Sequence, residues 1–363
     1  MDVKQVAEQF VIEGEIREAR SYGNGHINDT YLVTTKKDGV ERHFILQRIN
    51  TSIFKNPDEL MENILGVTRH LGKKIQAVGG GVARETLSVI PTCDGKSYYE
   101  TPEGDCYRMY AYIEHTDSLE QIEHATDFYA AAEAFGNFQY LLADYPADTL
   151  HETIPDFHHT KKRYERFLAV VEEDALGRAA EVAEEIAFVK AREQDMSVIV
   201  EALLQGEIPL RVTHNDTKLN NVLMDKDSGK GICVIDLDTV MPGSSLYDFG
   251  DSIRFGANHA AEDEVDLSKV WLDLELFEAY VSGYLKGCKG ALTQREIELM
   301  PMGAKLMTLE CGMRFLTDYL EGDIYFKIHR EGHNLDRCRT QFALVADMEE
   351  KWEQMHEIVR RVS

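Results

Sequence analysis

The sequence predicts an α+β protein built from two parts, a small antiparallel sheet with one helix followed by a larger, mainly helical part. Three observations lead to this prediction. Segments rich in β-forming residues dominate up to about residue 115, and amphipathic helical patterns dominate after about residue 118. The length of 363 residues favours two domains or one large bilobal unit, at about 150 residues per domain. We therefore expect one unit over residues 1–113 and a second over 114–363.

The first part begins with a predicted β-hairpin. Residues 30–35 are rich in β-branched and aromatic side chains, residues 36–39 form a turn, and residues 43–49 return as the second strand. A helix is predicted to begin at Asn56, because a proline follows and apolar side chains then recur at helical spacing. Residues 107–113 predict a further strand.

The second part is predominantly helical, with one β-rich interruption. Apolar residues at 131–142 mark a helix that ends before Pro146. Residues 160–204 and 341–362 predict acidic amphipathic helices whose charged faces are solvated. The interruption at 211–240 carries the polar residues on which the functional argument rests.

The composition restricts the partners and the compartment. There are 39 Lys and Arg residues against 64 Asp and Glu, a net charge of −25, which argues against nucleic acid or an anionic membrane as the main partner. No apolar stretch approaches the roughly 20 residues that cross a bilayer, and the N-terminus has no apolar signal segment. The six cysteines include no CxxC pair, so we expect reduced thiols in a cytoplasmic protein. The oligomeric state stays open.

A polar constellation in the β-rich interruption predicts the chemistry of the site. His214, Asp216 and Asn221 form an H-x-D-x-x-x-x-N pattern, and Asp236 follows the next apolar strand. Phosphoryl transfer needs a carboxylate that accepts or orients the proton of the attacking hydroxyl, and oxygen ligands that hold Mg²⁺ against the phosphates. The pattern assigns the first role to Asp216 and the second to Asn221 and Asp236. Asp238, two residues on in a strand, would point the same way and act as a further metal ligand.

A structural interpretation of this constellation also has to be weighed. Asp and Asn can occupy turn positions before a hairpin, and a lone H-x-D would favour that interpretation. Here the loop, a turn and an apolar strand ending in Asp-x-Asp occur together and in order, so we favour catalysis. His214 is expected to be buried and to shape the loop by hydrogen bonding.

Several strings along the chain carry a family resemblance. The sequence resembles the aminoglycoside phosphotransferase/choline kinase superfamily, which shares the protein-kinase-like bilobal fold, and within it the bacterial N-acetylhexosamine 1-kinases. The H-x-D-x-x-x-x-N loop is general to the superfamily, whereas the GHIN, LDT and ECGMRF strings are more specific. The matching strings lie at residues 23–28, 30–33, 50–54, 211–221, 235–239, 248–256, 310–315 and 318–326.

The resemblance implies a substrate and residue roles. ATP and Mg²⁺ would lie between a nucleotide-binding N-terminal lobe and a helical lobe, and Asp216 would act as the base toward the C1 hydroxyl of GlcNAc or GalNAc. The product would be the sugar 1-phosphate. His26, Arg314 and Tyr325 would contact the sugar, with Phe255 a weaker candidate of the same kind. Backbone groups of Tyr110, Tyr112 and Ile113 would form the hinge that receives the adenine.

The glycine-rich turn and the strand after it carry the phosphate-binding expectations. Gly23, Asn24 and Gly25 could cover phosphates with backbone N–H groups, although a simple hairpin turn is the alternative for an isolated GxG. Kinases usually place a Lys on the strand that follows. Here that position is Gln47, and the neighbouring Arg48 alternates to the opposite face. Helix residues 62 and 63 offer no replacement for the missing charge.

Further polar residues are assigned by their surroundings. Asp248 and Asp251 are expected to be structural, bracing the catalytic loop or capping the following helix. Arg314 lies in an apolar stretch and needs a partner, either Asp318 four residues on or the sugar, which the resemblance favours. Tyr319 and Asp323 could line the same pocket as Tyr325. His158 and His159 are expected in surface or core positions without metal.

Three alternatives to the hexosamine kinase remain open on the sequence. The nearest is a kinase of another small alcohol such as homoserine, choline or an aminoglycoside. The second is a nucleotide-binding pseudokinase scaffold, which the missing lysine keeps in view. The third is a structural or interaction protein whose motifs are coincidental.

Overall fold

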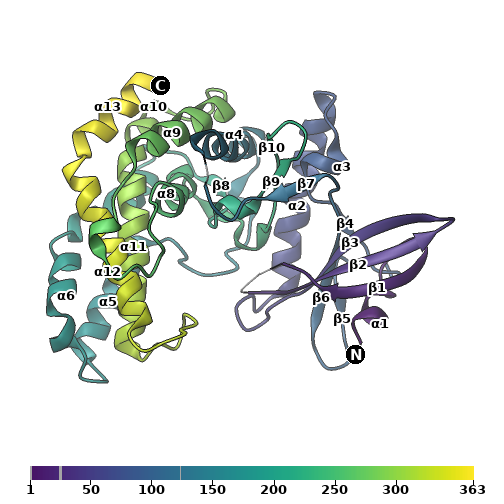
Figure 1. Cartoon of the computed structure of the whole chain (residues 1–363), viewed down its shortest axis with the longest axis horizontal. Helices are drawn as coiled ribbons and strands as arrows, with labels where there is room; N and C mark the ends of the chain where they lie inside the picture. The colour runs from purple at the N-terminus through teal and green to yellow at the C-terminus, as the bar shows by residue number, and fades with distance from the viewer. Residues whose placement is uncertain (1, 24–26, 123) are drawn as a thin grey trace.

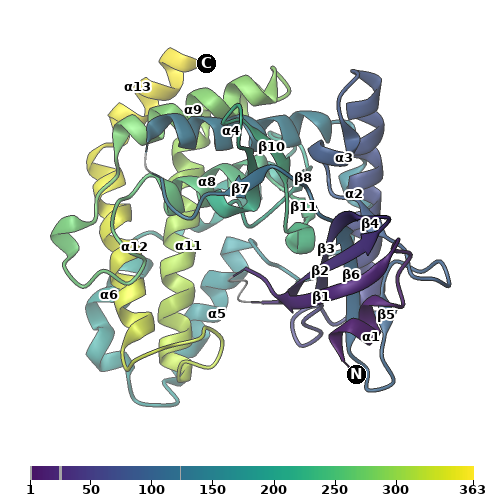
Figure 2. The same cartoon turned by 45° about the vertical axis from the view of Figure 1, so that its right-hand side comes forward.

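The computed structural model describes residues 2–23, 27–122 and 124–363. A twisted antiparallel sheet from the first part of the chain lies at one end, and the long helices of the second part lie at the other (Figure 1). Short strands of the β-rich interruption lie between them, as the turned view also shows (Figure 2). The predicted α+β class, with its sheet-then-helices order, is confirmed.

The N-terminal sheet has the strand order β1-β2-β3-β6-β4, with β5 paired to β6. Alternation along these strands gives the sheet two different faces. One face packs against α1 through Val33, Leu46 and Met109, each with no exposed surface. The other face carries Tyr110, which belongs to the same hydrophobic cluster as the core of the helical part. The bounds are α1 (Val3–Ala7), β1 (Glu15–Ser21), β2 (Asp29–Lys37), β3 (Val40–Arg48), β4 (Val89–Ile90), β5 (Tyr99–Glu100) and β6 (Cys106–Ala111).

The predicted elements of this part are present, with one change of length. The hairpin of β2 and β3 turns at Asp38 and Gly39, both of which have positive φ. Helix α2 (Pro57–Ala77) begins after Asn56, whose side chain accepts the Glu59 N–H. The strand predicted at 107–113 ends earlier, at Ala111, because the chain leaves the sheet there for the helical part. Helix α3 (Val82–Glu85) follows α2.

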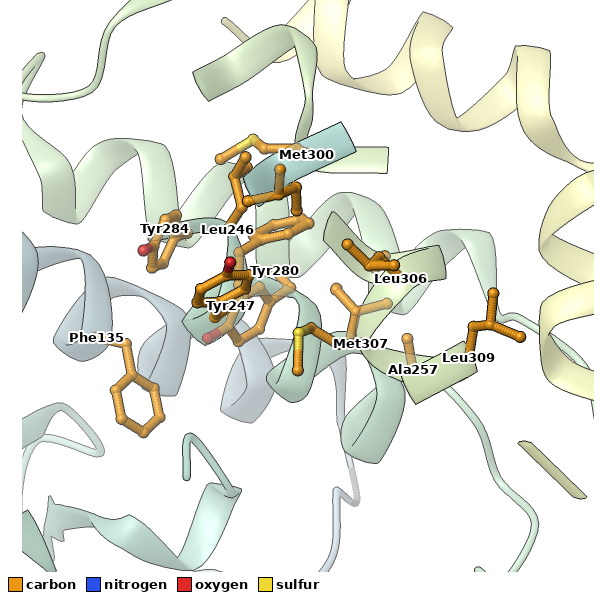
Figure 3. Close-up of a cluster of buried hydrophobic side chains, with 14 of the residues drawn as sticks. Phe135, Leu246, Tyr247, Ala257, Tyr280, Tyr284, Met300, Leu306, Met307 and Leu309 are labelled. Carbon is orange, nitrogen blue, oxygen red and sulfur yellow. The ribbon is translucent and has the colours of Figure 1, made fainter. Parts of the chain in front are cut away.

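The helical part is organised around close helix pairs. Helix α4 (Ala125–Leu141) packs on α9 (Leu274–Cys288), and α8 (Ser245–Gly256) packs on α11 (Met300–Glu321). Their shared core combines Tyr247 of α8, Tyr280 and Tyr284 of α9 and Met307 of α11 (Figure 3). The predicted helices at 160–204 and 341–362 are each broken into shorter ones. The remaining helices are α5 (Thr160–Glu173), α6 (Ala183–Lys190), α7 (Val198–Leu204), α10 (Gln294–Glu298), α12 (His333–Glu350) and α13 (Trp352–Val362).

The β-rich interruption, together with β7, forms two small sheets beside the N-terminal part. One has the order β10-β9-β7 and the other pairs β11 with β8. The chain between β10 and β11 does not continue as a strand, because Asp236 has a left-handed φ of 58° and residues 237–239 form a 3₁₀ turn. The bounds are β7 (Thr116–Ser118), β8 (Arg211–Thr213), β9 (Val222–Asp225), β10 (Gly231–Val234) and β11 (Met241–Gly243).

The sheet and the helical part follow each other along the chain. The boundary at residue 113 stays a prediction. Within the described part of the chain, no helix has the length and apolar character that spanning a bilayer requires.

Candidate active site

The loop after β8 is held by a buried carboxylate on α8. Asp248 accepts the backbone N–H groups of His214 (2.9 Å) and Asn215 (2.8 Å) and the side-chain N–H of Gln139 (2.8 Å). Asn215 has a left-handed φ of 64°, so the chain turns sharply just before Asp216. The predicted bracing role of Asp248 is therefore confirmed, whereas the helix is capped by Ser244 instead.

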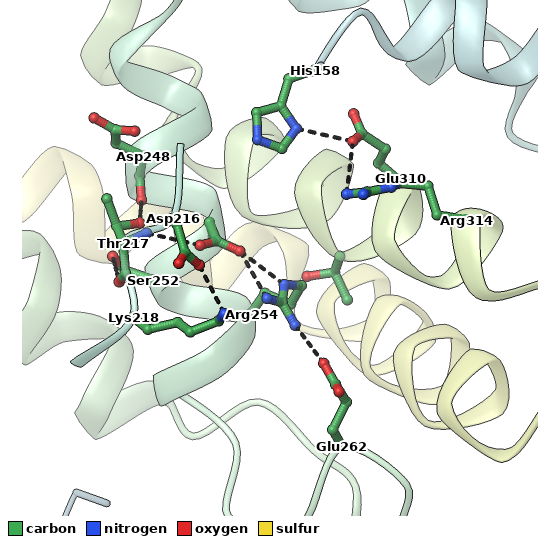
Figure 4. A network of polar contacts seen from close by, with 12 residues as sticks. His158, Asp216, Thr217, Lys218, Asp248, Ser252, Arg254, Glu262, Glu310 and Arg314 are labelled. Atoms are coloured by element: carbon green, nitrogen blue, oxygen red, sulfur yellow. Dashed lines mark hydrogen bonds and ion pairs between the residues drawn. The ribbon is translucent and has the colours of Figure 1, made fainter. Parts of the chain in front are cut away.

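A second acid and a lysine hold the next residues of the loop (Figure 4). Asp251 accepts the backbone N–H of Thr217 at 3.0 Å, and Arg254 donates to the other oxygen of Asp251 at 2.8 Å. The Nζ of Lys218 lies 2.9 Å from Oδ1 of Asp216, and this carboxylate raises the pKa of the lysine. Asp216 is thus presented on a rigid loop beside a cation.

His214 is buried and shapes the loop by hydrogen bonding, as predicted. The side chain has no exposed surface. One ring nitrogen lies 2.8 Å from the carbonyl oxygen of Ile235, and the other accepts the Asp216 N–H at 3.2 Å. The imidazole therefore ties the loop of Asp216 to the end of β10, which carries the next acidic residue.

Asn221 and Asp236 lie next to Asp216. The Nδ2 of Asn221 donates to the backbone oxygen of Asp216 (2.7 Å) and to its carboxylate (3.2 Å). The backbone N–H of Ile235 donates to the backbone oxygen of Asn221, which brings Asp236 alongside. Asp236 is exposed, yet nearby protein atoms displace part of the water around its carboxylate. This desolvation, together with the charges of Asp238 and Asp216, raises the pKa of Asp236.

These donors fit a hard divalent cation. The elevated pKa of Asp236 reports a cluster of carboxylates with too little compensating positive charge, which a metal ion would supply. Among the described residues, no group of three His, Cys, Asp or Glu side chains is arranged as a complete metal cage. Mg²⁺ does not need one, since it usually takes one or two protein oxygens and completes its shell with phosphates and water.

Asp238 does not share the orientation of Asp236. The prediction assumed a strand, in which alternate side chains share a face, but the 3₁₀ turn rotates Asp238 toward the N-terminal sheet. Its Oδ1 lies 2.5 Å from an Arg108 nitrogen, and its Oδ2 accepts from Asn28 at 2.6 Å. Asp238 is therefore bonded to the N-terminal part of the molecule, so the orientation assumed for it was wrong, and its role as a metal ligand stays a prediction.

Gln47 is occupied by neighbours in the sheet. Its amide oxygen accepts two N–H groups of Arg108, at 3.1 and 2.9 Å, and its amide nitrogen donates to Thr30 at 3.2 Å. Arg48 lies on the opposite face, as predicted, and pairs with exposed acids. Asn63 of α2 does not approach Gln47; it bonds to backbone groups of the helical part.

The predicted hinge residues differ in whether their backbone N–H groups are already hydrogen-bonded. Tyr110 lies in the ladder between β3 and β4, and the N–H of Tyr112 donates to His43 at 3.2 Å. In the described residues the N–H of Ile113 has no partner, so it is the donor available to a ligand. The hydroxyl groups of Tyr112 and Tyr22 lie 3.3 Å apart, which links the hinge to the glycine-rich turn.

The glycine-rich turn is partly described. Gly23 is exposed and has a φ of 73°, a conformation that glycine adopts without strain. Asn24, Gly25 and His26 lie outside the described residues, so their predicted roles stay predictions.

A second polar cluster lies near Asp216 on the helical side (Figure 4). Glu310 of α11 is 1% exposed and contacts His158 at 2.9 Å, with Arg163 at 3.9 Å and Arg314 at 4.0 Å. Burial opposes the charge of Glu310, but these neighbours prevail and lower its pKa. Arg314 also lies over the ring of Tyr325, at 5.8 Å.

Asp318 is not the partner of Arg314. It accepts the backbone N–H groups of residues 324–326, which fixes the loop that carries Tyr325. Tyr319 and Asp323 contact Arg178 instead of lining the pocket of Arg314.

A family match spans most of the chain. Residues 18–282 match the sequence profile of the Phosphotransferase enzyme family. The chain belongs to this family. It is therefore a small-molecule kinase with the protein-kinase-like fold, and the loop that carries Asp216 and Asn221 falls within the match.

Solved structures show the same fold. A microcompartment-associated aminopropanol kinase aligns with a TM-score of 0.64 at 16% identity, covering 98% of this chain and 99% of that one. An aminoglycoside phosphotransferase from Alicyclobacillus acidocaldarius aligns with a TM-score of 0.64 at 12% identity, covering 99% and 97%. A spectinomycin phosphotransferase in complex with ADP and spectinomycin aligns at 0.54 and 11% identity, covering 94% of each chain.

Sequence reasoning missed two polar residues of this phosphotransferase. Arg108 is 1% exposed and Glu310 is equally buried, so each needs a partner distant in sequence. The signal for Glu310 was an acid inside an apolar helix, next to the predicted Arg314. Among the described contacts Phe255 has no ring or cation partner, and it is 38% exposed at the end of α8.

Proposed function

We propose that this kinase transfers the γ-phosphate of ATP to the C1 hydroxyl of an N-acetylhexosamine, GlcNAc or GalNAc, and releases the sugar 1-phosphate. The observation that carries the proposal is the arrangement of Asp216, Asn221 and Asp236 on one braced loop and the adjacent turn. A proton acceptor and oxygen donors for a metal–nucleotide complex are thereby adjacent, which is what phosphoryl transfer asks of a protein.

Each residue of the loop has a defined task in this reaction. Asp216 accepts the proton of the attacking hydroxyl and orients its oxygen toward phosphorus. Asn221 and Asp236 would hold Mg²⁺, which neutralises charge on the phosphates. Lys218, paired with Asp216, places a positive charge next to the transferred group. Positioning and charge stabilisation together supply the rate enhancement.

The helical-side cluster supports a neutral, hydroxyl-rich acceptor. In the described structure, Glu310 keeps one oxygen and His158 one ring nitrogen without a hydrogen-bond partner. A sugar hydroxyl can donate to the first and bond to the second. Arg314 and the exposed ring of Tyr325 add a charged donor and an aromatic face beside them. His26 and Phe255 remain proposed sugar contacts.

The same cluster disfavours a cationic acceptor. Arg163 and Arg314 both lie within 4.0 Å of Glu310, so the cluster carries more positive than negative charge. Choline is held by aromatic cages and aminoglycosides by acidic pockets, and two arginines would repel either. Kinases of such amines are therefore the second candidates.

The nucleotide would be held at the junction of the lobes. The Ile113 N–H is the proposed adenine contact, and the turn at Gly23 would lie over the phosphates. This proposal keeps residues 1–113 as the nucleotide-binding unit and 114–363 as the catalytic unit, in the cytoplasm.

The test is a coupled assay of ADP release with a panel of acceptors. GlcNAc and GalNAc should give turnover in the presence of Mg²⁺, and choline, homoserine and kanamycin should give none above the rate without acceptor. Turnover restricted to an amine would overturn the hexosamine assignment. ATP binding without turnover of any acceptor would favour the scaffold.

A further inference from the structure

The sheet of this kinase carries a buried cation one strand away from the usual place. We propose that Arg108 of β6 binds the nucleotide phosphates in place of the lysine that β3 lacks, and that Asp238 holds the guanidinium until the nucleotide arrives. The proposal rests on the nucleotide site of the proposed function but not on the identity of the acceptor.

The register of the sheet places Arg108 beside the position of the missing lysine. Thr30, Gln47 and Arg108 are cross-strand partners on β2, β3 and β6. Cross-strand partners share a face, so the guanidinium occupies the face on which a β3 lysine would lie. Gln47 has both polar atoms engaged by Arg108 and Thr30, which makes it a positioning residue.

The guanidinium faces the proposed phosphate site. It contacts Asp238, two residues after the metal-binding Asp236, and the charge of Asp236 also acts on it. Asn28, which follows the glycine-rich turn, donates to the same Asp238 carboxylate. Arg108 therefore shares a carboxylate partner with Asn28, and that partner lies two residues from the acid that would hold the metal ion.

The contact between Arg108 and Asp238 is a buried ion pair that joins the sheet to the turn after β10. The Arg108 nitrogen and the Asp238 oxygen are 2.5 Å apart, and although burial opposes the charge, the charge of Asp238 and its hydrogen bond both raise the pKa of Arg108. Arg108 is 1% exposed, so this donor is also shielded from bulk water. A phosphate oxygen would replace the Asp238 oxygen as the charge-assisted partner of this donor.

A purely structural role makes a different prediction. Arg108 belongs to the N-terminal sheet and Asp238 to the helical part, so their ion pair also joins the two parts of the molecule. If joining were its whole function, its loss would weaken binding of any ligand between the lobes, with or without phosphates. A phosphate-binding role weakens phosphorylated ligands selectively.

The experiment compares binding of ADP and adenosine by calorimetry, in EDTA and in Mg²⁺. The test variant is Arg108→Gln/Asp238→Asn, because removing one partner alone leaves a buried charge unpaired. ADP should bind about 10- to 100-fold more weakly, the range expected for a lost charge-assisted hydrogen bond, while adenosine changes by less than about threefold. Retained adenosine binding shows that the cleft is folded. The control is Arg48→Gln, on the opposite face, which should change neither.

Two further variants sharpen the result. Arg108→Lys keeps the charge and should lose less ADP affinity than the double variant. Adding Gln47→Lys to the double variant returns the cation to β3 and should recover most of the lost ADP affinity. Equal weakening of ADP and adenosine, or no change in either, overturns the proposal. A wild type that binds ADP but leaves hexosamines unphosphorylated refutes only the acceptor assignment.

Discussion

At the scale of residues, the site depends on buried carboxylates. Each accepts hydrogen bonds from N–H groups of the protein in place of water. Asp248 accepts two successive backbone N–H groups of the catalytic loop and the amide of Gln139. Burial raises the pKa of Asp248, and the nearby His214 and these donors oppose that rise. One side chain of α8 therefore fixes the geometry of the loop, and it need not contact the substrate.

Replacing Asp248 with Asn tests this bracing. An amide offers one acceptor oxygen and turns an N–H toward a backbone N–H, so the catalytic loop should lose its fixed shape. We expect the free energy of unfolding to fall by about 2–4 kcal/mol, and kcat to fall about 100-fold with a much smaller change in KM for ATP. Denaturant unfolding and steady-state kinetics measure both. Asp227→Asn, in the exposed turn after β9, should change neither, and an unimpaired kcat in the Asp248 variant would contradict the bracing role.

The buried pair of Arg211 and Glu296 predicts a pH dependence of stability. Burial opposes the charge of Glu296, but hydrogen bonds from Arg211 at 2.5 and 2.8 Å prevail, and its pKa is lowered. A depressed carboxyl pKa stabilises the folded state above the ordinary value near pH 4.3, and that contribution is lost as pH falls through the lowered folded value.

Glu296→Gln should therefore cost about 3–5 kcal/mol at pH 7, because it leaves the Arg211 guanidinium buried without its anion. The difference in Tm between the wild type and the variant should shrink as pH is lowered from about 5 toward 3. Scanning calorimetry across this range measures it. A difference in Tm that stays constant with pH would refute the ionic nature of the pair.

At the scale of elements, helices α4 and α9 approach so closely that only glycine fits at several positions of their crossing. A Cβ at Gly136 of α4 would overlap the Tyr284 backbone oxygen, and one at Gly287 of α9 would overlap that of Glu133. Helix α4 also supplies Gln139, which contacts Asp248. The crossing of α4 and α9 thus supports the braced loop from behind.

The substitution Gly287→Ala tests the crossing. The added methyl has no space, so the helices must separate, and we expect a loss of about 1–3 kcal/mol in the free energy of unfolding. Gly72→Ala in α2 is the control, because its Cβ would meet Val82 at 3.3 Å without overlapping backbone. Urea unfolding compares the two. Equal stabilities of the two variants would show that the crossing is not tightly packed.

The sequence predicted the site where its parts are close along the chain. The H-x-D-x-x-x-x-N pattern correctly placed Asp216 and Asn221 together, because both lie on one loop, where their contact is local. Arg108 escaped prediction, since its meeting with Gln47 depends on the register of strands 61 residues apart. The orientation of Asp238 was predicted wrongly, because a left-handed residue two positions earlier ended the strand. The partnership of Glu310 with His158 spans 152 residues and leaves no local signature.

Fold prediction succeeded where the pattern is local and failed where tertiary packing decides the structure. Period-two and helical patterns are local, so the hairpin of β2 and β3 and the start of α2 were predicted correctly. The breaks within 160–204 depend on tertiary packing, because acidic amphipathic sequence alone is compatible with longer helices.

At the scale of the whole molecule, the two lobes share one apolar core. Buried residues of α2 and Tyr110 of β6 belong to the same cluster as the interior of the helical lobe. Asn63 adds buried hydrogen bonds from α2 to the backbone at His151 and Val240. We therefore expect the lobes to unfold together.

Calorimetry tests this expectation directly. A continuous core predicts a single transition whose calorimetric and van't Hoff enthalpies agree. Asn63→Leu, which removes the hydrogen bonds of this residue to the helical lobe, should lower the Tm without splitting the transition. Two separate transitions in the wild type would contradict the shared core.

The central claim is that Asp216 directs a sugar C1 hydroxyl onto the γ-phosphate. Phosphorus NMR of the reaction of Mg²⁺, ATP and GlcNAc or GalNAc, with wild type and with Asp216→Asn, tests it most directly. The account predicts a phosphate resonance coupled to the anomeric proton in the wild type, and a rate at least about 100-fold lower in the variant. A phosphate on any other hydroxyl, or an undiminished rate in the variant, would contradict it.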